Sequence, residues 1–203
     1  MANKKKKPVL FPVVFMIIIS AVFTFILASL NAASLDLIEA QEALKNQRSL
    51  LYLFDQPIPE DRESVQNAYK NLFEIKSIDD ITYYQAVSEG EVIGYAFPFQ
   101  GSGLWGSIWG YIAIDPDFTE IIGIDFLKDS ETPGLGGRIN ETAFKEQFRG
   151  IDISAQMDKF VIYNPAENGN ADVITGATLT SNAVQNMINA EIERLLEDVK
   201  GEI

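Results

Sequence analysis

The sequence predicts an α+β protein, with one N-terminal transmembrane helix followed by a single extracytoplasmic domain in which helices flank an antiparallel sheet. Three patterns carry this prediction. A charge-free apolar run lies near the N-terminus, apolar residues then recur with a period of two, and a helical period returns near the C-terminus. A chain of 203 residues with 47% apolar content has room for one domain with its own core.

The first apolar run extends from Val9 to Leu30 and contains no charged residue. A helix of that length spans about 30 Å, the thickness of the hydrocarbon core of a bilayer. Lysines precede the run at positions 4–7, so we expect a single pass through the inner (cell) membrane with the N-terminus in the cytoplasm and residues 34–203 outside. A cleaved signal peptide is the alternative, but its apolar region would be shorter, at about 7–15 residues.

Four segments follow from this organisation. They are a cytoplasmic N-terminus (1–8), a transmembrane helix (9–32), a helical linker region (33–78) and the extracytoplasmic domain (79–203). In the linker region, apolar spacing predicts an amphipathic helix over Ser34–Leu53, ended by two prolines, and a second helix over Asp61–Ile75.

Within the domain, alternating apolar residues around turn residues predict two hairpins, Ile81–Val87 with Glu91–Phe99 and Ile108–Asp115 with Ile121–Lys128. Asn140 is expected to cap a short helix through Phe148, and Lys159–Tyr163 is expected to form a strand. A closing helix from about Ser181 to Val199 is predicted to bury one apolar stripe, which consists of Val184, Met187, Ile188, Ile192, Leu195, Leu196 and Val199.

The composition excludes several classes of chemistry. The chain has no cysteine and no histidine. This excludes disulfides, Cys-ligated iron–sulfur clusters, Cys/His zinc sites, haem held by His or Cys, and the Ser-His-Asp triad. We expect no catalytic residue and no metal site, so any redox chemistry requires an organic cofactor.

The charge distribution argues against nucleic acid as a partner. Four of the 16 basic residues are the lysines at 4–7, which leaves 12 to face all 29 acidic residues. Such a domain repels phosphate backbones. Its acidic surface either docks basic loops of a partner protein or is simply a solvated face.

Three glycine-rich loops stand out: GSGLWG at 101–106, SETPGLGG at 130–137 and TGATLTS at 175–181. Each loop alone is typical of an ordinary turn. Together they suit a flat ligand with a phosphate tail, because glycine permits close approach and a helix N-terminus offers free N–H donors. Leu104, Trp105 and Leu135 would supply apolar walls, while residue chemistry leaves open which aromatic phosphate is bound.

The segment Asp172–Thr178 resembles the D-x-x-[ST]-G-A-T flavinylation motif of the FMN-binding domain family, and SETPGLGG resembles that family's second motif. GLWG, the single anchor and the TLTSN continuation resemble the C subunit of the Na⁺-translocating NADH:quinone reductase (NqrC) and the G subunit of the Rnf complex (RnfG). The short length favours the Rnf type, whereas GLW and TLTSN favour the quinone-reductase type.

This resemblance implies FMN joined through its phosphate to the oxygen of Thr178 by a separate flavin transferase. Thr175, Gly176 and Ala177 would then hold the phosphate, and Leu104, Trp105, Leu135 and Gly136 would lie against the flavin. Glu131 and Thr132 are expected at the polar edge of the flavin or its ribityl chain. Thr180 and Ser181 read as helix caps, and Asp172 is expected to bond loop N–H groups or to assist recognition by the transferase.

The resemblance further implies an electron-carrier subunit rather than an enzyme in its own right. It would work with other membrane subunits of an ion-translocating complex that moves electrons between reduced ferredoxin or NADH and NAD⁺ or quinone. Two alternatives remain: a stand-alone membrane-tethered flavoprotein for extracellular electron transfer, and a non-redox anchored scaffold module in which the TGAT segment is only a helix start.

Overall fold

The computed structural model describes residues 10–79, 81–154 and 159–203, which form two compact units with a boundary between Ala43 and Leu44. The first unit holds most of helix α1 (Leu10–Leu53). Its side chains from residue 10 to 33 are all exposed, and α1 is long and apolar enough to cross a membrane by length and composition. The predicted α+β class with a long apolar N-terminal helix is confirmed.

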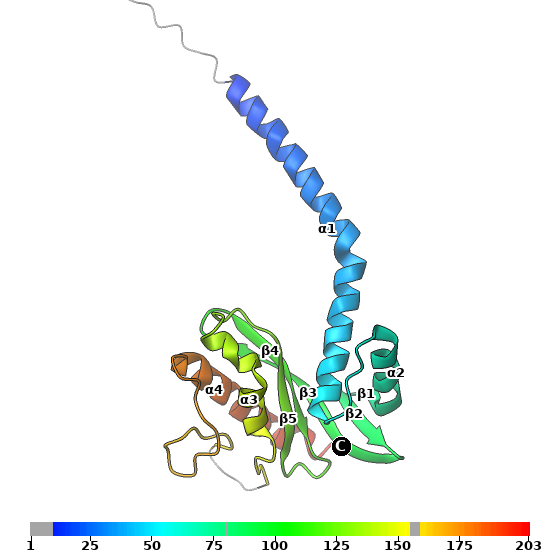
Figure 1. The fold of residues 1–203 in the computed structure, drawn as a ribbon, viewed down its shortest axis with the longest axis vertical. Helices are drawn as coiled ribbons and strands as arrows, with labels where there is room; N and C mark the ends of the chain where they lie inside the picture. The colour runs from blue at the N-terminus through cyan, green and yellow to red at the C-terminus, as the bar shows by residue number, and fades with distance from the viewer. Residues whose placement is uncertain (1–9, 80, 155–158) are drawn as a thin grey trace, which may run out of the picture. The chain divides into compact units, whose positions relative to one another are not determined.

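The second unit is built on one antiparallel sheet in which each strand pairs with the next along the chain (Figure 1). Its five strands are β1 (Phe73–Ile78), β2 (Ile81–Ser88), β3 (Glu91–Ser102), β4 (Ser107–Ile114) and β5 (Ile121–Lys128). Both predicted hairpins are present, as β2–β3 and β4–β5. Strand β1 was not predicted.

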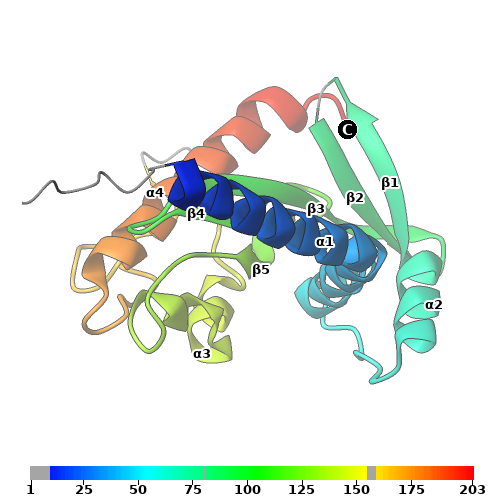
Figure 2. The same ribbon diagram turned by 90° about the horizontal axis from the view of Figure 1, so that it is seen from above.

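Helix α2 (Arg62–Leu72) is shorter than the helix predicted over Asp61–Ile75. It begins at Asp61, whose carboxylate accepts a hydrogen bond from the Ser64 N–H at 2.8 Å. It ends at Leu72 because Phe73 adopts an extended conformation and pairs with Ala86 of β2. Figure 2 shows α2 beside the start of β1.

The two faces of the sheet bury different side chains. Phe97 and Ile112 belong to a large core that includes helix α4 (Thr178–Arg194), and α4 packs against β3. Their neighbours Ala96 and Ala113 belong to a smaller core with α2 and the last turns of α1. This alternation is what a sheet with both faces covered requires.

The closing helix starts at Thr178 and continues beyond Arg194 as a π-helical turn, Leu195–Val199. It therefore begins three residues before the predicted Ser181. Five residues of the predicted stripe are fully buried: Val184, Ile188, Ile192, Leu195 and Val199.

Two local predictions in the segment before α4 are wrong: the cap at Asn140 and the strand over Lys159–Tyr163. The short helix predicted to end at Phe148 is present, but Asn140 does not cap it. Asn140 is the last residue of the 3₁₀ helix η1 (Gly136–Asn140), and the N-cap position of the next helix is Glu141. The Asn140 amide donates to Asp129 Oδ2 and to the Gly137 carbonyl. Helix α3 (Thr142–Lys145) and the 3₁₀ turn η2 (Glu146–Phe148) follow.

Lys159–Tyr163 forms no strand apart from a single bridge between Tyr163 and Ala171. Side-chain amides replace the strand partner here. Asn189 Oδ1 accepts the N–H groups of Phe160 and Val161, and Asn170 Oδ1 accepts that of Ile162.

Candidate functional site

The first glycine-rich loop joins β3 to β4 and projects two large apolar side chains. The loop is closed by a hydrogen bond of 2.7 Å from the Gly103 N–H to the Gly106 carbonyl. At its tip, Leu104 is 48% exposed and Trp105 is 69% exposed. Side chains of this size are normally buried, so their exposure together marks a candidate contact surface.

The second loop follows β5 and turns tightly at Thr132. The Thr132 carbonyl accepts hydrogen bonds from the N–H groups of Leu135 and Gly137, at 3.1 and 3.0 Å. Thr132 and Leu135 are exposed, whereas Gly136 is buried. This loop therefore presents two hydroxyls, those of Ser130 and Thr132, and the apolar side chain of Leu135 to solvent.

The third loop leads into α4 through a turn that requires glycine. Gly176 has φ +82°, in the left-handed region that glycine enters without steric cost. The next residue, Ala177, occupies the N-cap position of α4 and offers no side-chain hydrogen bond. The first N–H groups of a helix have no acceptor within it, so this end of α4 is suited to bind an anion.

The hydroxyl groups of this loop have two different fates. Ser181 Oγ accepts the Ile174 N–H at 3.0 Å and donates to the Ala177 carbonyl at 3.1 Å, while Thr180 Oγ1 donates to Glu131. Both side chains are buried inside the first turns of α4, so the prediction that they cap the helix is wrong. Thr175 and Thr178 are exposed.

The structure brings the three loops together. A Cβ placed on Gly176 would lie 3.5 Å from Leu135 Cδ2, so the second loop covers the TGAT turn. The carboxylate of Glu131 in the second loop bonds the backbone of the first loop and the side chain of Thr180. Leu179, which the sequence analysis did not single out, adds an apolar side chain that is 65% exposed directly after Thr178.

Glu131 and Asp172 both make hydrogen bonds within the protein. Both carboxylate oxygens of Glu131 accept hydrogen bonds from groups of the protein. Asp172 Oδ1 accepts a hydrogen bond of 2.9 Å from the side-chain amide of Asn164 rather than from loop N–H groups. Within the described ranges, no group of three or more acidic side chains is placed to hold a metal ion.

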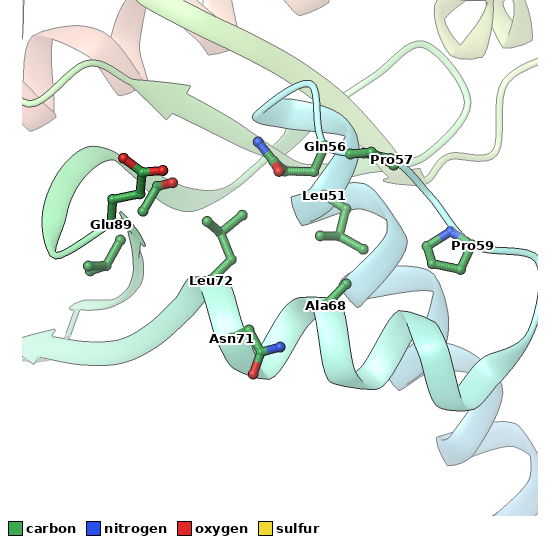
Figure 3. A pocket seen from close by; sticks show the side chains of 10 residues that line it. Leu51, Gln56, Pro57, Pro59, Ala68, Asn71, Leu72 and Glu89 are labelled. Atoms are coloured by element: carbon green, nitrogen blue, oxygen red, sulfur yellow. The ribbon is translucent and has the colours of Figure 1, made fainter.

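A separate pocket of about 390 Å³ lies between the last turn of α1, α2 and the β2–β3 hairpin (Figure 3). Its walls include Leu51, Pro57, Leu72 and Glu89. None of the residues predicted to bind a cofactor lines this pocket. The exposed residues of the candidate site lie instead on the three loops: Leu104, Trp105, Thr132, Leu135, Thr175 and Thr178.

Comparison with known proteins agrees with this architecture. Residues 103–193 match the model of the FMN-binding domain family, and all three loops fall in or at the edge of this range. The G subunit of an ion-translocating oxidoreductase complex from Methanosarcina acetivorans is 30% identical over 190 residues, which cover 89% of this chain and 91% of that protein.

A second relative is the C subunit of the Na⁺-translocating NADH-quinone reductase of Pasteurella multocida, which is 37% identical over 103 residues. The matched region covers 48% of this chain and 39% of that protein, so the chain spans well under half the length of this relative.

Crystal structures of two NqrC proteins share the fold. The protein from Parabacteroides distasonis superposes with a TM-score of 0.67 at 24% identity, covering 79% of this chain and 94% of that one. The protein from Shewanella oneidensis superposes with a TM-score of 0.62 at 19% identity, covering 72% and 89%. The chain belongs to the FMN-binding domain family, in the group that holds the C and G subunits of ion-translocating oxidoreductase complexes.

Proposed function

We propose that this chain is a membrane-anchored electron carrier that holds FMN through a phosphoester bond to Thr178. One observation carries the proposal. Thr178 places an exposed hydroxyl at the uncapped N-terminus of α4, next to a turn that Leu135 covers. A phosphate attached there would meet unpaired N–H donors and the positive end of the helix dipole.

The residues present suit FMN. A flat aromatic ring needs apolar walls, and Leu104, Trp105 and Leu135 are exposed on loops that Glu131 and Gly176 bring together. The hydroxyls of Thr175 and Thr132 are exposed for the polar tail or the ring edge. When bound, FMN accepts electrons from one partner and releases them to another, and the chain's own residues bind and orient it.

The attachment would need a flavin transferase, as the resemblance to the FMN-binding domain family implies. An ester through the phosphate leaves the ring unmodified, so its redox properties are tuned only by packing and hydrogen bonds. It would also keep FMN from being lost on the outer face of the inner membrane, where we place the domain from the positions of the lysines at 4–7.

The partners we propose are the other membrane subunits of an ion-translocating oxidoreductase complex. The Rnf type is favoured, because the G subunit from Methanosarcina acetivorans aligns over most of both chains. Electrons would pass between reduced ferredoxin or NADH and NAD⁺ or quinone, with the terminal donor and acceptor bound by other subunits. A stand-alone tethered flavoprotein would share the flavin but would purify without stoichiometric membrane subunits.

The proposal is tested by intact mass and by in-gel fluorescence after denaturation, on protein from its native host. Wild type should be heavier by one FMN less water and should fluoresce in the gel. Thr178→Ala should lose both signals. Thr178→Ser keeps a hydroxyl, so a measurable fraction of the protein should still carry FMN. The same is expected of the matched control Thr175→Ala. An unmodified wild-type mass would overturn covalent attachment and would favour the scaffold alternative.

A further inference from the structure

Glu131 is the one charged side chain that is buried among the residues the structure describes. It is only 6% exposed, yet it lies in a loop whose neighbours Thr132 and Leu135 are open to solvent. Burying a carboxylate is costly unless hydrogen bonds replace its hydration. The hydrogen-bond partners of Glu131 therefore indicate which parts of the protein its burial holds together.

The carboxylate joins two segments that are distant in sequence. Its Oε1 accepts the backbone N–H groups of Leu104 and Trp105, at 2.8 and 3.1 Å. Its Oε2 accepts the Thr180 hydroxyl at 2.6 Å. The same side chain therefore holds the tip of the first loop and the first turn of α4, which carries Thr178.

Two glycines leave the space that this carboxylate needs. A Cβ on Gly103 would lie 2.5 Å from Glu131 Oε1, and a Cβ on Gly136 would lie 2.6 Å from Glu131 Oε2 and 2.6 Å from Thr180 Oγ1. Contacts this short are prohibitive, so any larger residue at either position would displace the carboxylate or the hydroxyl.

The backbone around Glu131 is itself held in place. The Glu131 N–H donates to Asp129 Oδ1 at 2.9 Å, and the Asn140 amide donates to Asp129 Oδ2 at 2.8 Å and to the Gly137 carbonyl at 3.1 Å. The carboxylate thus projects from a braced loop, which suits it for fixing the position of other groups.

We propose that Glu131 is a positioning residue that fixes the Leu104–Trp105 tip against the first turn of α4, so that the apolar walls are in place before FMN is attached. That Glu131 prepares a flavin site rests on the proposed function. The set of hydrogen bonds by which Glu131 holds Leu104, Trp105 and Thr180, called the clamp below, is a property of the protein without flavin. The positioning role is exerted on the N–H groups of Leu104 and Trp105 and on the Thr180 hydroxyl, and it is distinct from a contact with the polar edge of the flavin.

The test uses tryptophan fluorescence, since the chain has two tryptophans. In the Trp109→Phe background of the full-length protein in detergent, Trp105 is the sole reporter of the loop tip. Time-resolved anisotropy is measured with Thr178→Ala added, so that no flavin is attached. We expect Glu131→Ala to lose most of the residual anisotropy of Trp105, because the ring then moves with a free loop.

Three further variants separate the loss of the Glu131 hydrogen bonds from a general loss of structure. Glu131→Gln should restore the anisotropy, because its Oε1 can still accept both N–H groups while its amide faces the Thr180 hydroxyl. The matched control Glu141→Ala removes an exposed carboxylate that bonds Arg138 and should leave the anisotropy unchanged. Thr180→Val should loosen the tip partly and should add little to Glu131→Ala, as expected for two ends of one interaction.

In flavin-loaded protein with Thr178 intact, the anisotropy of the flavin should fall in Glu131→Ala and recover in Glu131→Gln. Equal Trp105 anisotropy in Glu131→Ala and its parent would overturn the proposal. If Glu131→Ala does not fold, an unchanged tip in Thr180→Val would overturn it instead. A wild type that lacks flavin would refute the proposed function, while the Trp105 measurement would still decide whether the clamp exists.

Discussion

The loops around Thr178 and the cluster around Arg149 are two regions of the same domain that differ in how their side chains are used. Those around Arg149 bond other groups of the protein, whereas several around Thr178 are exposed to solvent. Arg149 donates to the carbonyls of Leu53, Ile122 and Tyr52, at 2.8, 2.5 and 2.9 Å, and pairs with Glu146 at 2.8 Å. Nearby, Lys145 pairs with Asp125 at 2.7 Å and lies 4.1 Å from the centre of the Tyr52 ring. Around Thr178, by contrast, a hydroxyl and several apolar side chains are exposed.

This difference separates what maintains the fold from what is available to a ligand. Arg149 ties the last turn of α1 to β5 and η2, and it uses its donors within the protein. Burial raises the pKa of the Tyr52 phenol, as does its hydrogen bond to Glu146, so this phenol stays protonated near neutral pH. The comparison predicts that changes in the two regions affect different observables.

The largest expected effect is the complete loss of bound flavin in Thr178→Ala, with little change in stability. The Thr178 side chain is exposed and caps no helix, so its removal should change the free energy of unfolding by no more than about 0.5 kcal/mol. Denaturant unfolding of the unflavinylated protein measures this. A loss of several kcal/mol would show that the hydroxyl serves the fold, and the contrast between the two regions would fail.

The opposite pattern is expected for Arg149→Met, which keeps the aliphatic stem but removes the guanidinium. The carbonyls of Leu53, Ile122 and Tyr52 would lose their side-chain donor, and the free energy of unfolding should fall by about 3 kcal/mol. The same unfolding experiment measures the loss, and intact mass at a temperature where the variant is folded should still show one FMN. A variant that is stable but not flavinylated would contradict the separation.

The sequence predicted the exposed region better than the buried connections. Glycines and hydroxyls carry a local signal, so the TGAT turn and the SETPGLGG loop could be recognised without knowledge of the fold. The partners of Glu131 lie 27 and 49 residues away in sequence, and its carboxylate could be assigned to the backbone of Leu104 only once the sheet was known.

Elements that depend on remote partners were likewise missed. Strand β1 has mostly exposed side chains and is defined by pairing with β2. Its sequence alternates only over residues 73–76, and its first three residues were assigned to the preceding helix. Lys159–Tyr163 has the composition of a strand, but Asn189 and Asn170 supply the acceptors that a neighbouring strand would provide. In both cases the deciding contact is tertiary, and local propensity is a weak guide.

A smaller effect is expected at the opposite end of β4 from the first loop, where Asp115 organises the turn into β5. Burial alone would raise the pKa of this carboxyl, but hydrogen bonds from the Glu120 and Thr119 N–H groups and the Thr119 hydroxyl lower it below its usual value. Because the folded-state pKa is lowered, its stabilising contribution is present above the unfolded-state pKa and is lost as the pH falls through the folded-state pKa.

Asp115→Asn should therefore cost about 1 kcal/mol at neutral pH and should be less destabilising in acid, where the wild type has also lost the charged acceptor. Unfolding curves from neutral to acidic pH measure this convergence, and flavin content should not change. A gap between the two proteins that stays constant with pH would show that the carboxylate charge is not what stabilises the turn.

The smallest change in stability, with a distinct change at the site, is expected for Leu135→Ala. Leu135 is 47% exposed, so truncation should alter the free energy of unfolding by only about 0.5 kcal/mol. Its Cδ2 nevertheless covers the Gly176 turn, and in the proposed function it forms one wall for the flavin ring. The variant should keep its covalent FMN by mass but should show lower flavin anisotropy and a visible spectrum closer to that of free FMN.

Ile75→Ala is the matched control, because Ile75 is 61% exposed on the edge strand β1. This substitution should leave the flavin signal unchanged. If Leu135→Ala leaves the spectrum unchanged, the flavin ring does not contact Leu135. The exposed apolar side chains around Thr178 would then be interpreted as a surface on which a partner protein docks.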